Sequence, residues 1–332
     1  MTESMPQLKV IANKTAVMIP NAVSHPKLQK VDSGKASSCD PLTPTIFHED
    51  WWLDAATGGN FDVAKVSVSG RVVGRLPFNV TKRFGLKMIR MPAMTYFLGP
   101  AIDEGEGTLN TRFLKRFEIT RELLGKLPRA SWQYLKCHAG VTDVIAFQEL
   151  GFRTHVQFTH EIRPDRVDVL WQQMRNKTRN VIRKAEDQFS VNELSDPAEF
   201  VRLYQRNLQV RKVDNGIDAT LCQKIISASL ERHRGRILAV HDEHDQIVAA
   251  NFCAWDENSC FYVLSTRGDN SGNGAISLLL WEAIKESARR GLVFDFAGLG
   301  DKGSVLFYSG FGASISTRYI GVTFARVGKG VE

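Results

Sequence analysis

Alternating apolar and polar residues in the first half of the chain predict strands. Residues 62–70, DVAKVSVSG, place valines between polar neighbours, and RVVGRLPFNVTKRFG follows after the turn at Ser69-Gly70, so this segment predicts a β-hairpin. KMIRMPAMTYFLGP, WQYLKCH and THVQFTHEI predict further strands. Helices are expected over residues 108–127 and over DVIAFQELGF, where Gly151 is the expected C-cap. The first half is therefore predicted to be rich in strands.

The second half of the chain has a clearer order of elements. One helix is predicted from Pro164-Asp165 to about Gln188, and DPAEFVRLYQRNLQV and LCQKIISASLERH predict two more. Asp196 is the expected N-cap of the first of these, with Pro197 at its first position. From about residue 190 onwards, the pattern reads β-α-α-β-β-β-α-β-α-β. Three antiparallel strands thus lead into a helix and further strands.

The first 44 residues differ in character from the rest. SHPKLQKVDSGKASSCDPLTP is rich in Ser, Lys, Pro and Gly without an apolar period, so residues 1–44 are predicted to be a disordered leader. A chain of 332 residues corresponds to about two domains at roughly 100–200 residues each. We therefore expect an N-terminal domain over residues 45–162 and a C-terminal domain over residues 163–332.

Composition narrows the class of protein. With 43% hydrophobic and 24% charged residues, the chain is globular. Its five cysteines are an odd number without a CxxC motif, which is typical of a reducing compartment. No apolar run reaches the roughly 18–20 residues of a membrane span, and no signal layout opens the chain. We therefore expect a cytoplasmic protein without a membrane span. The net charge of +7 suits an anionic ligand but identifies none.

Three short stretches carry a resemblance to a known family. MRNKTRNVIRKAE at residues 174–186, VFDFAG at 293–298 and VLFYSGFGA at 305–313 resemble the K-x-R-x-x-I-R-K-A helix, the DF-G strand and the F-K-x-G-F-G turn of FemAB-like proteins. Over about residues 46–325, the chain resembles the FemAB-like, GNAT-fold acetyltransferase family, including the GNAT-like domains of polysaccharide-biosynthesis proteins. The resemblance implies an α+β fold of two tandem GNAT-like (acyl-CoA N-acyltransferase) domains, each with a mixed, mostly antiparallel sheet flanked by helices.

Two departures from the Fem pattern concern the donor. Tyr308 stands where Fem-type ligases, which use aminoacyl-tRNA, often carry Lys, and no segment is long enough for their helical-hairpin arm. Both departures favour acetyl-CoA or another acyl-CoA as the donor. An aminoacyl-tRNA-dependent Fem-type transferase and a non-catalytic GNAT-fold binding protein remain the alternatives.

The stretch TRGDNSGNGAISLLL runs from a strand through a glycine-containing loop into a helix. In GNAT enzymes, the coenzyme pyrophosphate lies at this helix N-terminus, where unpaired N–H groups and the positive helix end attract anions. The resemblance therefore assigns Ser265, Arg267, Gly272, Gly274 and Ala275 to acyl-CoA binding. Arg267 lies five residues before Gly272, which is not the standard spacing, so an ordinary strand-to-helix loop is the other interpretation.

Two residues are candidates for proton transfer. Asp295 alternates with Phe294 and Phe296, so its carboxylate points away from them and would act as general base on an acceptor amine or hydroxyl, or orient a neighbouring arginine. Tyr308 is the candidate donor of a proton to the leaving thiolate, by the role that the GNAT resemblance gives it. Packing between Phe307 and Phe311 is its alternative.

Other residues are candidates for substrate binding. Arg175, Arg179 and Arg183 recur every four residues along the predicted helix, where they would bind phosphate or cover the wet edges of an apolar face. Lys302 belongs to GLGDKG, which is expected to be a substrate loop, because the long helix of a dinucleotide-binding motif does not follow it. Aromatic and backbone surface for a sugar is predicted near Trp52, Thr95 and Gly99.

These assignments define one expected function. The chain is predicted to move an acyl group, with acetyl expected, from acyl-CoA to an amine or hydroxyl of a sugar or cell-envelope precursor, as in polysaccharide or cell wall biosynthesis. The acceptor is thus a small molecule or glycan precursor, with tRNA as a second possible partner and no DNA. No metal is expected, because His241 and His244 lie in a polar turn without a third ligand.

Overall fold

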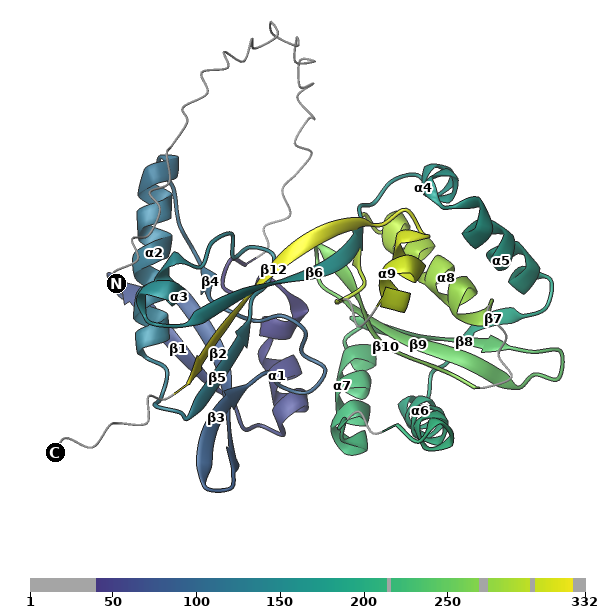
Figure 1. Cartoon of the computed structure of the whole chain (residues 1–332), viewed down its shortest axis with the longest axis horizontal. Helices are drawn as coiled ribbons and strands as arrows, with labels where there is room; N and C mark the ends of the chain where they lie inside the picture. The colour runs from purple at the N-terminus through teal and green to yellow at the C-terminus, as the bar shows by residue number, and fades with distance from the viewer. Residues whose placement is uncertain (1–39, 214–215, 269–273, 299–301, 325–332) are drawn as a thin grey trace, which may run out of the picture. The chain divides into compact units, whose positions relative to one another are not determined.

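The computed structural model describes residues 40–213, 216–268, 274–298 and 302–324 (Figure 1). Within these ranges, the strands form one sheet in the order β1-β2-β3-β5-β12-β6-β11-β10-β9-β8-β7, with β4 paired to β2. Neighbouring strands are mostly antiparallel, and β3–β5 and β10–β11 are parallel pairs. Helices flank the sheet (Figure 1). The predicted α+β class with a mostly antiparallel sheet flanked by helices is confirmed.

The first half of the chain follows the predicted pattern closely. Gly70, with φ of 81°, closes the predicted hairpin between its first two strands. The side chain of Thr108 accepts a hydrogen bond from the N–H of Thr111 and so caps the long helix. The elements are η1 (Ile46–His48), α1 (Asp50–Thr57), β1 (Asp62–Val68), β2 (Arg71–Arg83), β3 (Leu86–Arg90), β4 (Ala101–Ile102), α2 (Leu109–Gly125), β5 (Trp132–Lys136), α3 (Ile145–Glu149) and β6 (Arg153–Ile162).

The second half has the predicted order of elements from β7 to β12. Asp196 caps α6 as expected, because its carboxylate accepts the N–H of Ala198 at 2.8 Å. The elements are α4 (Val167–Gln173), α5 (Asn176–Glu186), β7 (Ser190–Glu193), α6 (Pro197–Arg211), α7 (Ala219–Glu231), β8 (Gly235–His241), β9 (Ile247–Trp255), β10 (Ser259–Arg267), α8 (Ala275–Arg289), β11 (Val293–Asp295), α9 (Lys302–Ser309) and β12 (Ser314–Phe324).

The single helix predicted from Pro164 to Gln188 is in fact two helices, α4 and α5. The chain is extended at the break, where the N–H of Arg175 donates to the carbonyl of Gly310 at 2.9 Å. Gly312 lies so close to α4 that an added Cβ would be 3.1 Å from the Cβ of Gln173. The turn after α9 therefore occupies the break, a tertiary contact that helical periodicity does not reveal.

The last strand joins the two halves of the sheet. β12 lies between β5 and β6, with Ile320 paired to both Lys136 and His155. β6 then pairs with β11 at Asp295 and Glu161. Strand pairing thus continues across the predicted domain boundary after residue 162. Of the predicted leader, residues 1–39 lie outside the described ranges.

A membrane span was a further question raised by the sequence. Among the described helices, none combines the length and the apolar character needed to cross a bilayer.

Candidate functional site

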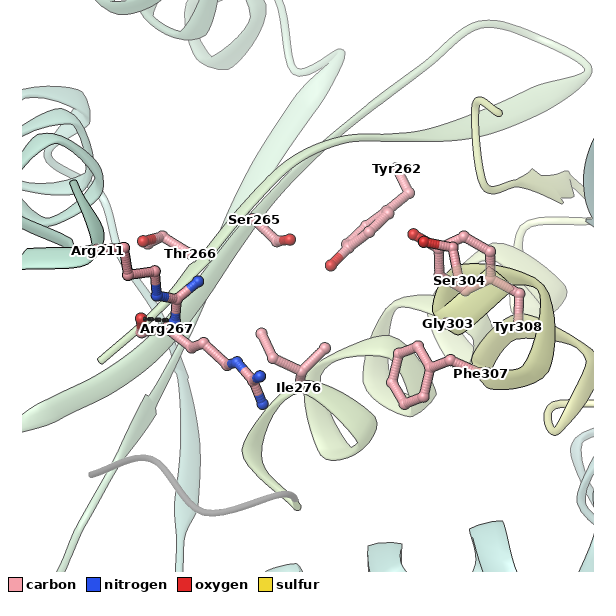
Figure 2. Close-up of a pocket in the computed structure, with 10 residues that line it drawn as sticks. All are labelled: Arg211, Tyr262, Ser265, Thr266, Arg267, Ile276, Gly303, Ser304, Phe307 and Tyr308. Atoms are coloured by element: carbon pink, nitrogen blue, oxygen red, sulfur yellow. Dashed lines mark hydrogen bonds between the residues drawn. The ribbon is translucent and has the colours of Figure 1, made fainter. Parts of the chain in front are cut away.

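A cavity of about 490 Å³ opens where β10 separates from β11 (Figure 2). In the described residues, β11 pairs with β10 only as far as Asp295 and Phe261, whereas β10 continues to Arg267. The last residues of β10 therefore form one wall, and helices α6, α8 and α9 supply the others. The lining residues are Arg211, Tyr262, Ser265, Thr266, Arg267, Ile276, Gly303, Ser304, Phe307 and Tyr308.

Tyr96, from the first half of the chain, reaches the opening between the two strands. Its hydroxyl donates to the carbonyl of Val263 at 2.6 Å, at a point where β11 no longer pairs with β10. Burial raises the pKa of Tyr96 above its ordinary value, so the hydroxyl remains a donor at neutral pH. The same holds for Tyr262, whose pKa is also raised by burial. Two neutral phenols, those of Tyr96 and Tyr262, thus lie beside the opening.

Positive charge gathers at one end of the cavity. Arg211 and Arg267 both line it, and Nη2 of Arg211 donates to the carbonyl of Arg267 at 2.6 Å (Figure 2). None of the ten residues that line the cavity is a carboxylate. Guanidinium groups favour phosphate oxygens, because each donates several hydrogen bonds in a fixed plane. The arrangement suits a ligand with an anionic end.

Three of the predicted site residues lie on the cavity wall: Ser265, Arg267 and Tyr308. Ala275 is buried at the start of α8, next to Ile276 of the wall. A Cβ on Gly274 would lie 2.7 Å from that of Ala185, so this glycine allows α8 to pack closely on α5. Gly272 lies outside the described residues.

The other lining residues were not identified from the sequence. Arg211 is the last residue of α6, and it belongs to no recognised sequence motif. Tyr262 and Thr266 follow the alternation of β10, which predicts a strand but not which face lines a cavity. The remaining ones are Ile276, Gly303, Ser304 and Phe307.

Asp295 lies in a buried ion pair rather than at the cavity. The residue is 1% exposed, and its Oδ1 accepts from Thr159 Oγ1 at 2.6 Å and from the N–H of Ala297 at 2.7 Å. Its Oδ2 accepts from Nη2 of Arg318 at 2.9 Å. Burial raises the pKa of Asp295, and Arg318 opposes that shift. This geometry favours the alternative in which Asp295 orients an arginine, because both oxygens already have donors.

Tyr308 is packed against aromatic rings and also lines the cavity. Its ring centroid is 4.3 Å from that of Phe296 and 6.2 Å from that of His160, so the side chain is packed. It also lines the cavity (Figure 2). The role of Tyr308 as proton donor to a leaving group stays a prediction.

The basic residues of α5 lie away from the cavity. Arg179 donates to the carbonyl of Gln172 at 3.2 Å, at the end of α4, and the guanidinium of Arg183 lies 5.4 Å from the ring of Trp171. Arg175 is exposed at the break between the helices. This placement favours arginines that cover the wet edges of an apolar face. Lys302, also exposed, begins α9 one residue before Gly303 of the wall.

The surface predicted for a sugar is part of the core. Trp52 is 0% exposed, and its Nε1 donates to Oγ1 of the buried Thr95 at 3.0 Å. Gly99 is buried too, where an added Cβ would be 3.1 Å from the Cα of Cys137. Because these three residues are buried, the structure does not support substrate contact by them. The sequence did not reveal this, because aromatic residues occur both in cores and on binding surfaces.

Candidate metal ligands are scattered in the described part of the chain. It contains no group of three His, Cys, Asp or Glu side chains close enough to hold an ion. His244 is exposed in its turn, where Asp242 accepts the backbone N–H of His244 and of Gln246, both at 2.9 Å.

Comparisons with known proteins concern the family model and the fold. Residues 172–303 match the family model of the acetyltransferase (GNAT) domain. The structure is similar to that of FemX, with a TM-score of 0.58, 12% identity and coverage of 81% of this chain and 90% of FemX. No curated protein sequence matches the chain.

Two further solved structures are similar. One is the C-terminal domain of a putative lysylphosphatidylglycerol synthetase from Agrobacterium fabrum, with a TM-score of 0.54, 13% identity and coverage of 85% of this chain and 90% of that domain. The other is a tandem GNAT protein from the clavulanic acid biosynthesis pathway, with a TM-score of 0.51, 10% identity and coverage of 84% and 89%. At such identities the likeness concerns the fold, and it confirms the predicted tandem GNAT-like fold.

Proposed function

Because this chain is a GNAT-fold protein of the FemAB-like kind, we propose that it transfers an acyl group from acyl-CoA to an amine or hydroxyl of an acceptor. The observation that carries the proposal is the cavity at the end of β10, with Arg211 and Arg267 on its wall and no carboxylate. The two arginines would bind the phosphates of the donor. Acetyl as the acyl group, and a sugar or cell-envelope precursor as the acceptor, stay predictions.

The reaction requires a polarised thioester carbonyl and a proton for the departing thiolate. Beyond Phe261, backbone N–H groups on the β11 side of β10 have no strand partner in the described residues, so they are available to the thioester oxygen. When the acceptor attacks the carbonyl carbon, the C–S bond breaks, and the hydroxyl of Tyr308 would supply the proton to sulfur. Tyr308 and Ser265 of β10 line the same cavity, which supports proton donation by Tyr308 and polarisation of the carbonyl by the backbone of β10.

Removal of one arginine from the cavity should weaken donor binding. Arg267→Gln is expected to raise the Kd for acetyl-CoA roughly 10- to 100-fold, since a hydrogen bond to a charged group contributes about 1.5–3 kcal/mol. Isothermal titration calorimetry measures this directly. Arg183→Gln is the matched control, because Arg183 lies on the ring of Trp171 outside the cavity, and its Kd should not change. Equal Kd values for wild type and Arg267→Gln would contradict the assignment.

An aminoacyl-tRNA donor is the second candidate. The exposed side chains of Arg175, Lys177, Arg183 and Lys184 along α5 favour it, since clustered cations bind RNA phosphates. It requires binding of charged tRNA whose affinity falls steeply with salt and falls further in Arg183→Gln. Binding of acetyl-CoA without any salt-dependent binding of tRNA would exclude it.

A further inference from the structure

The pairing of Asp295 with Arg318 leaves the proposed reaction without an assigned base. A base must lie near the opening between β10 and β11, because that is where the thioester would be attacked. It must also have a lone pair that is not already held by donors. The candidates are therefore the polar side chains of the sheet beside this opening.

One face of the sheet carries a row of polar side chains next to the opening. The strand register pairs Lys136 with Ile320, Arg318 with Gln157, and Glu161 with Asp295. Residues paired directly, and residues two apart in a strand, share a face. Lys136, Arg318, Gln157 and Asp295 therefore lie on the same face of four adjacent strands, β5, β12, β6 and β11.

Lys136 differs from the other charged members of this row. Arg318 is paired with Asp295 and with Glu161, whereas Lys136 has no carboxylate within ion-pair distance among the described residues. Its Nζ lies instead 5.7 Å from the ring centroid of Tyr96 and 5.4 Å from that of Phe97. The side chain is half-buried. The two rings stabilise the ammonium form but do not occupy Nζ with a conventional hydrogen bond, so the group can still contact another partner.

The surroundings of Lys136 raise its fraction of neutral amine near physiological pH above that of an ordinary lysine, while the ammonium form still predominates. Burial lowers the pKa of Lys136 to about 8, the charge of Arg318 adds to that shift, and the charge of Asp295 opposes it. Glu161 faces the same cluster but is occupied by Arg318. Lysines that act as general bases have pKa values lowered in this way.

Tyr96 connects Lys136 to the opening. Its ring lies under Nζ of Lys136, and its hydroxyl donates to Val263 of β10, one residue from Tyr262 of the cavity wall. Tyr96 also interacts electrostatically with Tyr308. The row thus offers the amine of Lys136 to a substrate that approaches β10 from this side.

We propose that Lys136 is the general base that takes a proton from the ammonium group of the acceptor. The inference rests on the proposed acyl transfer. Nζ of Lys136 accepts one proton, the resulting amine forms the C–N bond with the thioester carbon, and the C–S bond breaks. Tyr308 protonates the thiolate, the second amine proton leaves as the amide forms and restores the hydroxyl of Tyr308, and Lys136 returns its proton to water. Acyl-CoA and the ammonium thus give amide, free thiol and one released proton.

Three variants distinguish a lysine that acts as a general base from a lysine that only supplies positive charge. Lys136→Met and Lys136→Arg are expected to lower kcat/KM roughly 100-fold or more for transfer from acetyl-CoA to ethanolamine or glucosamine as probe amines, because general bases contribute about 10²- to 10⁴-fold. Arginine keeps the positive charge but does not release its proton. The control is Lys87→Met, which removes an exposed lysine of β3. All three variants should bind acetyl-CoA with the Kd of the wild type.

A chemical titration tests the same amine without any acceptor. Competitive labelling with acetic anhydride between pH 6 and 11, read by mass spectrometry, should place the midpoint for Lys136 near 8, below the value of about 10.4 for a lysine in a model peptide. A midpoint for Lys136 as high as that of the model peptide, or full turnover by Lys136→Arg, overturns the inference. Wild-type protein that binds no acetyl-CoA would instead contradict the proposed function, since the labelling does not depend on the donor.

Discussion

Arg318→Met is expected to lower the free energy of unfolding by about 3–5 kcal/mol, because it leaves a buried carboxylate without its cation. The side chains of Arg318 and Asp295 are 3% and 2% exposed, and Arg318 also pairs with Glu161 of β6. The ion pair therefore links β12, β11 and β6 at the middle of the sheet. Urea denaturation at pH 7.5 measures the change.

Two comparisons isolate the buried charge as the cause. Arg166→Met removes an arginine from an ion pair with Asp168 whose side chains are 78% and 55% exposed, and it should cost less than about 1 kcal/mol. Asp295→Asn, added to Arg318→Met, should recover part of the loss, since it removes the unpaired charge and keeps an oxygen for Thr159 and Ala297. A loss below 1 kcal/mol for Arg318→Met alone would show that the pair does not stabilise the sheet.

At pH 4, His138 alone is expected to make the free energy of unfolding about 3 kcal/mol lower than at pH 7.5. Burial lowers the pKa of His138 from 6.5 to about 4. Between these two values the unfolded chain binds a proton and the folded chain does not, so stability is lost as the pH falls below 6.5. His48, whose ring centroid is 5.1 Å from that of His138, has a lowered pKa as well and acts in the same direction.

The comparison with His138→Gln separates this effect from other titrations. Asp295 and Asp256 have pKa values raised by burial, so they favour the folded state as the pH falls and oppose the histidines. Glutamine does not titrate but can still donate to the carbonyl of Pro100, which His138 contacts at 3.0 Å. Chemical denaturation of both proteins from pH 8 to 4 should give a smaller loss for the variant. An equal loss of unfolding free energy in both proteins would mean that the pKa of His138 is not lowered in the folded state.

Local patterns in the sequence were enough to predict much of the fold. Alternation identified the hairpin at Gly70, and the expected N-cap Asp196 placed the start of α6. The position of β12 between β5 and β6 was not predictable in this way, because strand order depends on pairing between distant segments. The break between α4 and α5 has the same origin, since it depends on a contact with Gly310.

The site was harder to predict than the fold. Ser265, Arg267 and Tyr308 were identified because motifs marked their segments, and they lie on one cavity. Asp295 alternates as a strand-end carboxylate should, but its burial depends on Arg318, a residue 23 positions away. Lys136 carried no signal at all, because its surroundings are formed by Tyr96 and Phe97 from another segment and by strands from the end of the chain.

The central claim is that the cavity beside β10 binds acyl-CoA, and thermal unfolding with acetyl-CoA tests it most directly. At about 100 times its Kd, a ligand that binds only the folded state adds about 2.7 kcal/mol of stability. We predict a raised Tm for the wild type and for Arg183→Gln, and no change for Ser265→Trp, whose larger side chain would project from β10 into the cavity and obstruct the donor. An unchanged Tm in the wild type, or an equal rise in Ser265→Trp, would contradict the account.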